Sequence, residues 1–243
     1  MMCDLDVKIN KVIASLREEL EIDITKPVEI NKLLEKLVIV LREAKLAEGV
    51  YGSCKTVGRK RLITIDPCIP YPNQKRFVIS HEVGHILLHQ SSYICSKSDF
   101  EIWQAKSEYE KELEANAFAA ELLLPKKYVV EQIRKADLSM KFIEGLAEHY
   151  ETTFTSAAIA AVKAYNDEAI IVCHKNGTKI WSCNSRECFY TITKSIYAPN
   201  KNGIVNANLW INEDDDELKC EQEIIYFKNL DLHITILKFF KYE

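Results

Sequence analysis

The sequence predicts an α+β protein with a mixed first part and a β-rich last part. Up to about residue 165, apolar residues recur mainly at helical spacing, interrupted by strand-like apolar runs at 38–41 and 61–66. From about residue 167 the period changes to two, and Asn176-Gly177 separates two strand-like runs. We therefore expect four segments: an N-terminal amphipathic helix over 1–24, an α+β domain over 25–125, a helical segment over 126–166 and a β-rich region over 167–243.

Composition narrows the classes of protein to which the chain can belong. Its 243 residues are 47% hydrophobic, which is enough to bury a substantial core. Acidic residues outnumber basic ones by 36 to 32, which argues against nonspecific binding of nucleic acid. The start of the chain lacks the pattern of a signal peptide, and no apolar run approaches the roughly 20 residues that cross a bilayer. With eight cysteines but no CxxC pair, we expect a cytoplasmic protein with reduced thiols and no membrane partner.

One predicted helix contains the motif HExxH, as His81-Glu82-Val83-Gly84-His85. Residues four apart lie on one face of a helix, about 6 Å apart along its axis, so both imidazoles can bind one metal ion beside Glu82. The surrounding residues are apolar, where three unligated polar side chains would be costly. The spacing therefore indicates a metal site suited to hydrolysis, with zinc as the expected ion and manganese or iron as alternatives.

Two histidines leave a divalent ion short of one protein ligand. His89 lies eight residues after His81, roughly 12 Å along the axis, which is too far for both to bind one ion. The next predicted helix carries Glu112 and Asn116 one turn apart. We expect Glu112 to be the third ligand, with Glu114 as the alternative, and Asn116 to hold a ligand histidine by its free ring N–H.

The two motif stretches, Arg76–His89 and Glu112–Pro125, together resemble the ImmA/IrrE family of bacterial and mobile-element metallopeptidases. The resemblance covers roughly residues 25–165 and implies a zincin-like fold for the 25–125 domain. It implies that zinc is bound by His81, His85 and Glu112 and that Glu82 is the general base. It also implies cleavage of a protein partner, such as a helix-turn-helix repressor, which derepresses genes of a phage, a mobile element or a stress response. Leu124 stands where the family often has Met.

The strand expected directly before the motif helix is assigned to substrate binding. Zincin sites commonly hold a substrate in extended form against an edge strand. We therefore expect the substrate to pair with Leu62, Ile63, Thr64 and Ile65. The polar stretch over 91–100 shows no period and is expected to loop over the cleft.

The helical segment is expected to contain helices over 126–134, 140–150 and 155–165. The last two have the outline of a helix-turn-helix, but the final helix offers small apolar side chains where base readout uses Arg, Asn or Gln. Direct DNA binding is therefore not expected, and packing or partner docking is. The β-rich region, with two predicted hairpins, is expected to recognise a partner.

These patterns favour a metal-dependent, site-specific endopeptidase that cleaves a repressor or an antitoxin. Glu82 acts as the base that takes a proton from water. One alternative is a metal-bound module that sequesters the repressor or antitoxin without cutting it, and a second is a DNA-binding regulator. The complete HExxH motif favours the enzyme, because a structural metal site would be closed by a fourth ligand and would not need Glu82. The sequence does not indicate the oligomeric state.

Overall fold

The computed structural model describes residues 4–89, 93–96, 110–193, 202–211 and 217–241. The chain divides into two compact units, one of residues 1–125 with 147–153 and the other of residues 126–146 with 154–243. Both units combine helices with a sheet, so the predicted α+β class is confirmed. Each unit has a hydrophobic core of its own, while the finer division into four segments stays a prediction.

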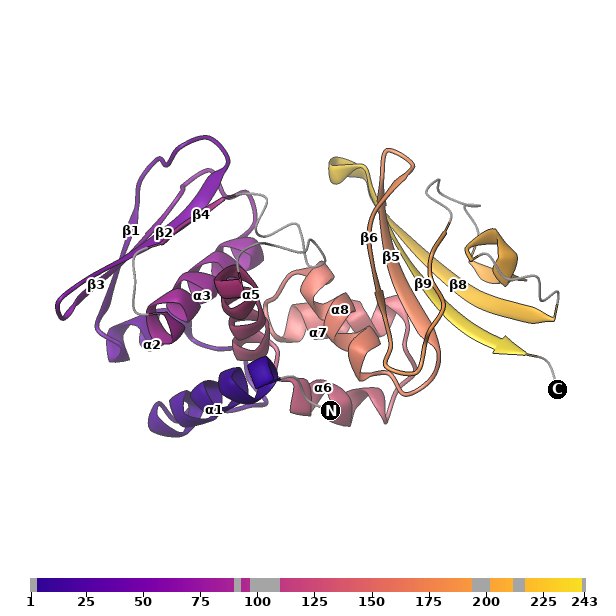
Figure 1. The fold of residues 1–243 in the computed structure, drawn as a ribbon, viewed down its shortest axis with the longest axis horizontal. Helices are drawn as coiled ribbons and strands as arrows, with labels where there is room; N and C mark the ends of the chain where they lie inside the picture. The colour runs from indigo at the N-terminus through magenta and orange to yellow at the C-terminus, as the bar shows by residue number, and fades with distance from the viewer. Residues whose placement is uncertain (1–3, 90–92, 97–109, 194–201, 212–216, 242–243) are drawn as a thin grey trace. The chain divides into compact units, whose positions relative to one another are not determined.

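The first unit consists of a four-stranded sheet with helices on one of its faces (Figure 1). The strands lie in the order β1-β3-β2-β4, in which β1 is parallel to β3 and the other pairs are antiparallel. The strand bounds are Ile39–Glu43 (β1), Val50–Val57 (β2), Lys60–Ile65 (β3) and Tyr93–Ser96 (β4). The helix bounds are Asp4–Glu19 (α1), Ile30–Lys36 (α2), Pro72–Leu88 (α3) and Glu110–Leu123 (α5).

Strand β4 lies in the stretch that was expected to be an irregular loop. Residues 93–96 pair with β2, and the rest of the 91–100 stretch lies outside the described residues. The expectation is therefore wrong for β4. A strand of four residues is too short to show a reliable period, and its pairing partner lies about forty residues earlier in the chain.

Helix α3 is the central helix of this unit. Pro72 occupies its first turn, where a missing N–H costs nothing, and every residue from 77 to 86 is buried. Gly84 explains how closely α5 approaches it: a β-carbon there would lie 3.0 Å from Cδ1 of Phe118 and 3.3 Å from the α-carbon of Ala115. The two helices that carry the predicted ligands therefore pack directly against each other.

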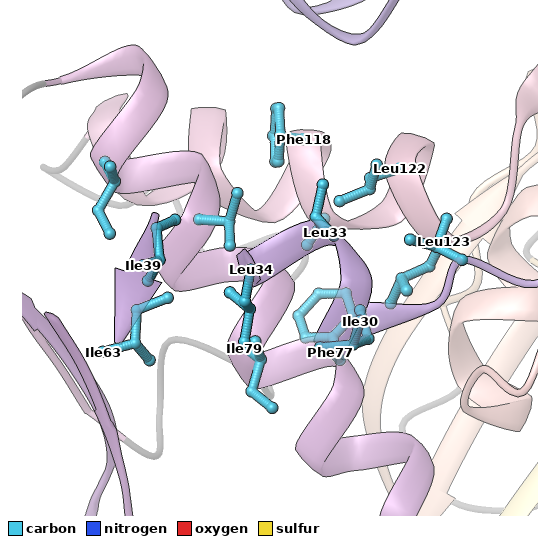
Figure 2. Packing of buried hydrophobic residues seen from close by; sticks show 14 of the residues in the cluster. Ile30, Leu33, Leu34, Ile39, Ile63, Phe77, Ile79, Phe118, Leu122 and Leu123 are labelled. Atoms are coloured by element: carbon cyan, nitrogen blue, oxygen red, sulfur yellow. The ribbon is translucent and has the colours of Figure 1, made fainter. Parts of the chain in front are cut away.

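The core of the first unit joins these helices to the sheet. Figure 2 shows side chains of α2, α3 and α5 packed around Ile39 of β1 and Ile63 of β3. Ile63 and Phe118 are both fully buried. The burial of this apolar surface supplies the main stabilisation of the unit and holds α3 and α5 in a fixed relation.

The second unit is built on a five-stranded antiparallel sheet in the order β6-β5-β9-β8-β7. The strand bounds are Ala169–Lys175 (β5), Thr178–Asn184 (β6), Gly203–Asn206 (β7), Leu218–Phe227 (β8) and Leu232–Lys241 (β9). Both predicted hairpins are confirmed, whereas β7 was not expected. The turn between β5 and β6 has positive φ at Asn176 (49°) and Gly177 (76°), as a type I′ hairpin turn requires.

Between Pro125 and β5 the chain forms the helices α6 (Lys126–Ile133), α7 (Met140–His149) and α8 (Phe154–Ala164). The end of α7 belongs to the first unit, where the hydroxyl of Tyr150 donates a hydrogen bond of 2.8 Å to the carbonyl of Ile24. Helix α8 contacts β5 and β6 in the second unit and buries most of its residues. Among the described helices, none has the length and apolar character needed to cross a bilayer.

Candidate metal site

The two motif histidines and Glu112 come together between α3 and α5. The Nε2 atoms of His81 and His85 lie 2.9 Å apart. Glu112 reaches both of them, with Oε2 at 3.2 Å from Nε2 of His81 and Oε1 at 3.2 Å from Nε2 of His85. Among the described residues, these three form the one group of histidine, cysteine and carboxylate side chains whose ligand atoms converge closely enough for a metal ion.

The electrostatics of the group favour an ionised Glu112. Burial by itself would raise the pKa of this carboxyl, but its close contacts with the imidazoles of His81 and His85 outweigh burial and lower the pKa to about 2. Both histidines are fully buried. The site therefore presents a carboxylate and two imidazole nitrogens, all of which are good ligands of a divalent metal.

Asn116 lies where the sequence placed it, one turn beyond Glu112 on α5. Its Oδ1 lies 2.9 Å from Nδ1 of His81, and the pair is buried. An amide oxygen in this place accepts the Nδ1–H of the ring and leaves Nε2 unprotonated toward Glu112 and His85. The side chain thus orients one ligand histidine.

The other ligand histidine has a partner that the sequence did not indicate. Nδ1 of His85 lies 3.1 Å from Nδ1 of His89, whose Nε2 lies 3.1 Å from Oε2 of Glu114. The same Glu114 oxygen accepts a bond of 2.8 Å from the ammonium of Lys8 on α1. Glu114, the alternative third ligand, is therefore not in the ligand group, because its carboxylate is turned toward His89 and Lys8.

Glu82 lies fully buried in α3, against strand β2. A β-carbon at Gly52 of β2 would lie 2.5 Å from Oε1 of Glu82 and 2.8 Å from Cγ1 of Val78. Such distances are far below ordinary van der Waals contact, so a side chain at position 52 would have to displace the Glu82 carboxylate and Val78. This contact was not predicted from the sequence.

The expected edge position of the strand assigned to substrate binding is wrong. Residues Leu62, Ile63, Thr64 and Ile65 lie in β3, which pairs with β1 on one side and β2 on the other. The backbone donors and acceptors of β3 therefore already have partners, and no peptide can add to it as a further strand. The edge position could not be predicted because strand order depends on long-range pairing; among the described strands, β1 and β4 are the edges.

The donor set fits a zinc ion. Zinc–nitrogen bonds of about 2.0–2.1 Å place two imidazole nitrogens on one tetrahedral ion roughly 3.3 Å apart. The observed separation of 2.9 Å between the two Nε2 atoms needs only a small opening to reach that value. Two histidines and one glutamate also leave a coordination position for water or substrate, as in hydrolytic zinc sites.

Fold and site define the class of protein: an α+β chain with a buried His, His, Glu group able to bind a divalent metal. A family model of the M78 peptidases, described as the IrrE N-terminal-like domain, matches residues 34–161, which is more than half of the chain. The chain belongs to this family.

Comparisons with individual proteins add information about the fold. Among solved structures, the chain is similar to a Mycobacterium tuberculosis transcriptional regulator, with a TM-score of 0.53 and 11% sequence identity. The match covers 98% of this chain and 77% of that one. At this identity the likeness concerns the fold alone. No curated protein matches the chain.

Proposed function

We propose that this chain is a metal-dependent endopeptidase that cleaves a protein partner, with zinc as its ion. The observation that carries the proposal is the convergence of His81, His85 and Glu112 from two helices, with the buried carboxylate of Glu82 in the same turn of α3. A purely structural metal site has no use for that additional carboxylate. Membership of the M78 peptidase family supports the same class of reaction.

The bound ion and the side chains of the protein would have different roles in the proposed reaction. When bound, a divalent ion would lower the pKa of a water molecule and polarise the scissile carbonyl. Glu82 accepts a proton from the attacking water at one carboxylate oxygen and passes it to the leaving amine nitrogen. A C–O bond forms as the C–N bond breaks, and the proton lost by water ends on the amine, so no further reactant is needed.

We place the substrate against strand β4 instead of β3. A peptide can add only to an edge of the sheet, and the edges formed by the described strands are β1 and β4. Gly52 pairs with Cys95 of β4 and is the residue whose α-carbon lies against Glu82. The β4 edge is therefore one strand away from Gly52, which lies against the proposed base, whereas β1 is separated from β2 by β3.

The proposed substrate is a helix-turn-helix repressor or an antitoxin, cleaved in the cytoplasm to derepress phage, mobile-element or stress genes. This part rests on what the family resemblance implies. DNA binding by the chain itself is disfavoured by α8, which buries Ala157, Ala158 and Ala161 and exposes few groups able to read bases.

Metal content is the first test. Elemental analysis of the purified chain, after dialysis against zinc, should find about one ion per chain, and Glu112→Ala should lose most of it because a ligand is removed. Glu110→Ala is the matched control, since Glu110 is an exposed residue of the same helix. Wild-type protein that takes up neither zinc nor manganese would rule out the proposal.

Cleavage is the second test. The zinc-loaded chain and its Glu82→Gln variant are incubated with helix-turn-helix repressors and antitoxins from the same genome, and intact masses are recorded. The wild type should convert one of them into two fragments whose masses sum to the substrate plus one water, whereas Glu82→Gln should keep its zinc and lose cleavage by about 10²–10⁴-fold. A tight complex without new masses would instead support sequestration.

A further inference from the structure

We infer that His89 and Glu114 are positioning residues for the proposed metal ligand His85, and that they determine which ring nitrogen of His85 carries its proton. The inference rests on the metal site of the proposed function. His89 and Glu114 belong neither to the HExxH motif nor to the proposed ligand group, so the role inferred for them is additional to the proposed function.

Three polar contacts in series carry the inference. Nδ1 of His85 lies 3.1 Å from Nδ1 of His89, Nε2 of His89 lies 3.1 Å from Oε2 of Glu114, and Nζ of Lys8 lies 2.8 Å from the same oxygen. The side chain of His89 is 4% exposed and that of Glu114 is 17% exposed. The first two contacts are therefore shielded from water.

The carboxylate at the end of this series fixes the direction of every hydrogen bond. An ionised Glu114 can only accept, so His89 donates to it from Nε2–H. Nδ1 of neutral His89 then carries a lone pair and accepts from Nδ1–H of His85. Nε2 of His85 is consequently unprotonated, and this is the atom that faces Glu112 and His81.

The ion pair at the end of the series agrees with this order. Nζ of Lys8 lies 2.8 Å from Oε2 of Glu114, and an ammonium group at this distance favours the carboxylate form of its partner. The series therefore ends in a charged acceptor.

The two ligand histidines are held by different chemistry. His81 is held by the amide of Asn116, which could present either its oxygen or its nitrogen to the ring. His85 is held through His89 by a carboxylate, which has no donor to present. The arrangement thus selects the metal-binding tautomer of His85 by charge.

Lys8, His89 and Glu114 should contribute differently to metal affinity. Lys8 is half exposed, at 50%, and an exposed ion pair contributes little. His89 and Glu114 are shielded, and outer partners of ligand histidines typically affect metal affinity by about 10–100-fold. We therefore expect large effects at His89 and Glu114 and a small effect at Lys8.

The test compares zinc affinity with apoprotein stability in His89→Leu, Glu114→Met, Glu114→Gln and Lys8→Met, with Glu110→Gln as the control. The zinc dissociation constant is measured by competition with a chromophoric chelator, and apoprotein stability by thermal unfolding. His89→Leu and Glu114→Met should bind zinc about 10–100-fold more weakly with little change in apoprotein stability. Glu114→Gln should recover part of the affinity, because its amide oxygen can still accept from His89. Lys8→Met should have a small effect, and Glu110→Gln should bind like wild type.

Two results would overturn the inference. One is zinc binding by Glu114→Met and His89→Leu that is as tight as in wild type. The other is a loss of affinity that follows an equal loss of apoprotein stability, with no recovery in Glu114→Gln, since that would indicate a packing role only. Should His89→Leu not fold, the two Glu114 variants decide alone. If the wild-type chain itself binds no zinc, the proposed function fails together with the inference, whereas tight binding by all variants removes the inference alone.

Discussion

Gly52 of strand β2 and Glu82 of helix α3 lie in direct contact, so that a β-carbon at position 52 would be 2.5 Å from Oε1 of Glu82. The strand carries no side chain at the point where the helix presents its buried carboxylate. Gly52 does not have a positive φ, so backbone conformation does not require glycine there. The requirement is one of space, and it positions the proposed base.

Gly52→Ala should therefore displace the Glu82 carboxylate without removing a ligand of the metal. We expect zinc affinity close to wild type and a fall of about 10²-fold in the rate of partner cleavage, because misplacing a catalytic group by about 1 Å has that effect. Cleavage rates and chelator competition measure the two quantities. Ser53→Ala, the next residue of β2, is the control, and cleavage by Gly52→Ala at the wild-type rate would refute the positional role.

Gly84 should be intolerant of any side chain, because α5 packs against it at Phe118 and Ala115. Gly84→Ala is expected to lower the free energy of unfolding by about 1–3 kcal/mol through overpacking, despite the better helix propensity of Ala. Gly145→Ala is a matched exchange in α7, where a β-carbon meets no atom within 4 Å. It should leave stability unchanged or raise it. Denaturant unfolding compares the two variants, and equal effects would contradict the close helix crossing.

Arg17 should be important for docking α1 onto α5. Its Nη2 donates to the carbonyl of Leu122 at 2.7 Å and to that of Glu121 at 3.5 Å, near the end of α5, where carbonyls lack partners within the helix. Arg17→Met keeps most of the apolar stem and should lower the free energy of unfolding by about 1–3 kcal/mol. The exposed Lys11→Met in the same helix should have little effect. A variant of Arg17 as stable as wild type would show that this contact is dispensable.

His174 should make the protein less stable in mild acid. Burial, with smaller contributions from the charges of His233 and Lys179, lowers its pKa from 6.5 to about 4. Between pH 6.5 and pH 4 the imidazole of His174 is protonated in the unfolded chain but neutral in the folded chain. Its contribution to the free energy of unfolding is therefore present above pH 6.5 and is lost as the pH falls toward 4. The loss from this group is at most about 3 kcal/mol.

The pKa of His174 can be measured directly by NMR titration of its ring. Unfolding experiments from pH 7 to 4.5 should show a steeper loss of stability for wild type than for His174→Gln, whose side chain does not titrate. A measured pKa near 6.5, or parallel pH profiles of the two proteins, would contradict the prediction.

Much of the site could be predicted because helical periodicity is local. The distance between His81 and His85 follows from four residues of one helix, and Glu112 and Asn116 are also one turn apart. The choice between Glu112 and Glu114 followed from helical faces alone. Similarly, the hairpin between β5 and β6 was readable from Asn176-Gly177, because few residues adopt positive φ at both turn positions.

The features of the site that could not be predicted depend on which segments of the chain lie next to one another. The sequence by itself determined the α+β class, the motif helices, the candidate metal-binding group and the family. Only the tertiary structure placed β3 inside the sheet, formed β4, brought Gly52 against Glu82 and linked His85 through His89 to Glu114 and Lys8. The physical reason is that strand order and contacts between helices are decided by the burial of apolar surface over the whole unit, which no local window of sequence contains.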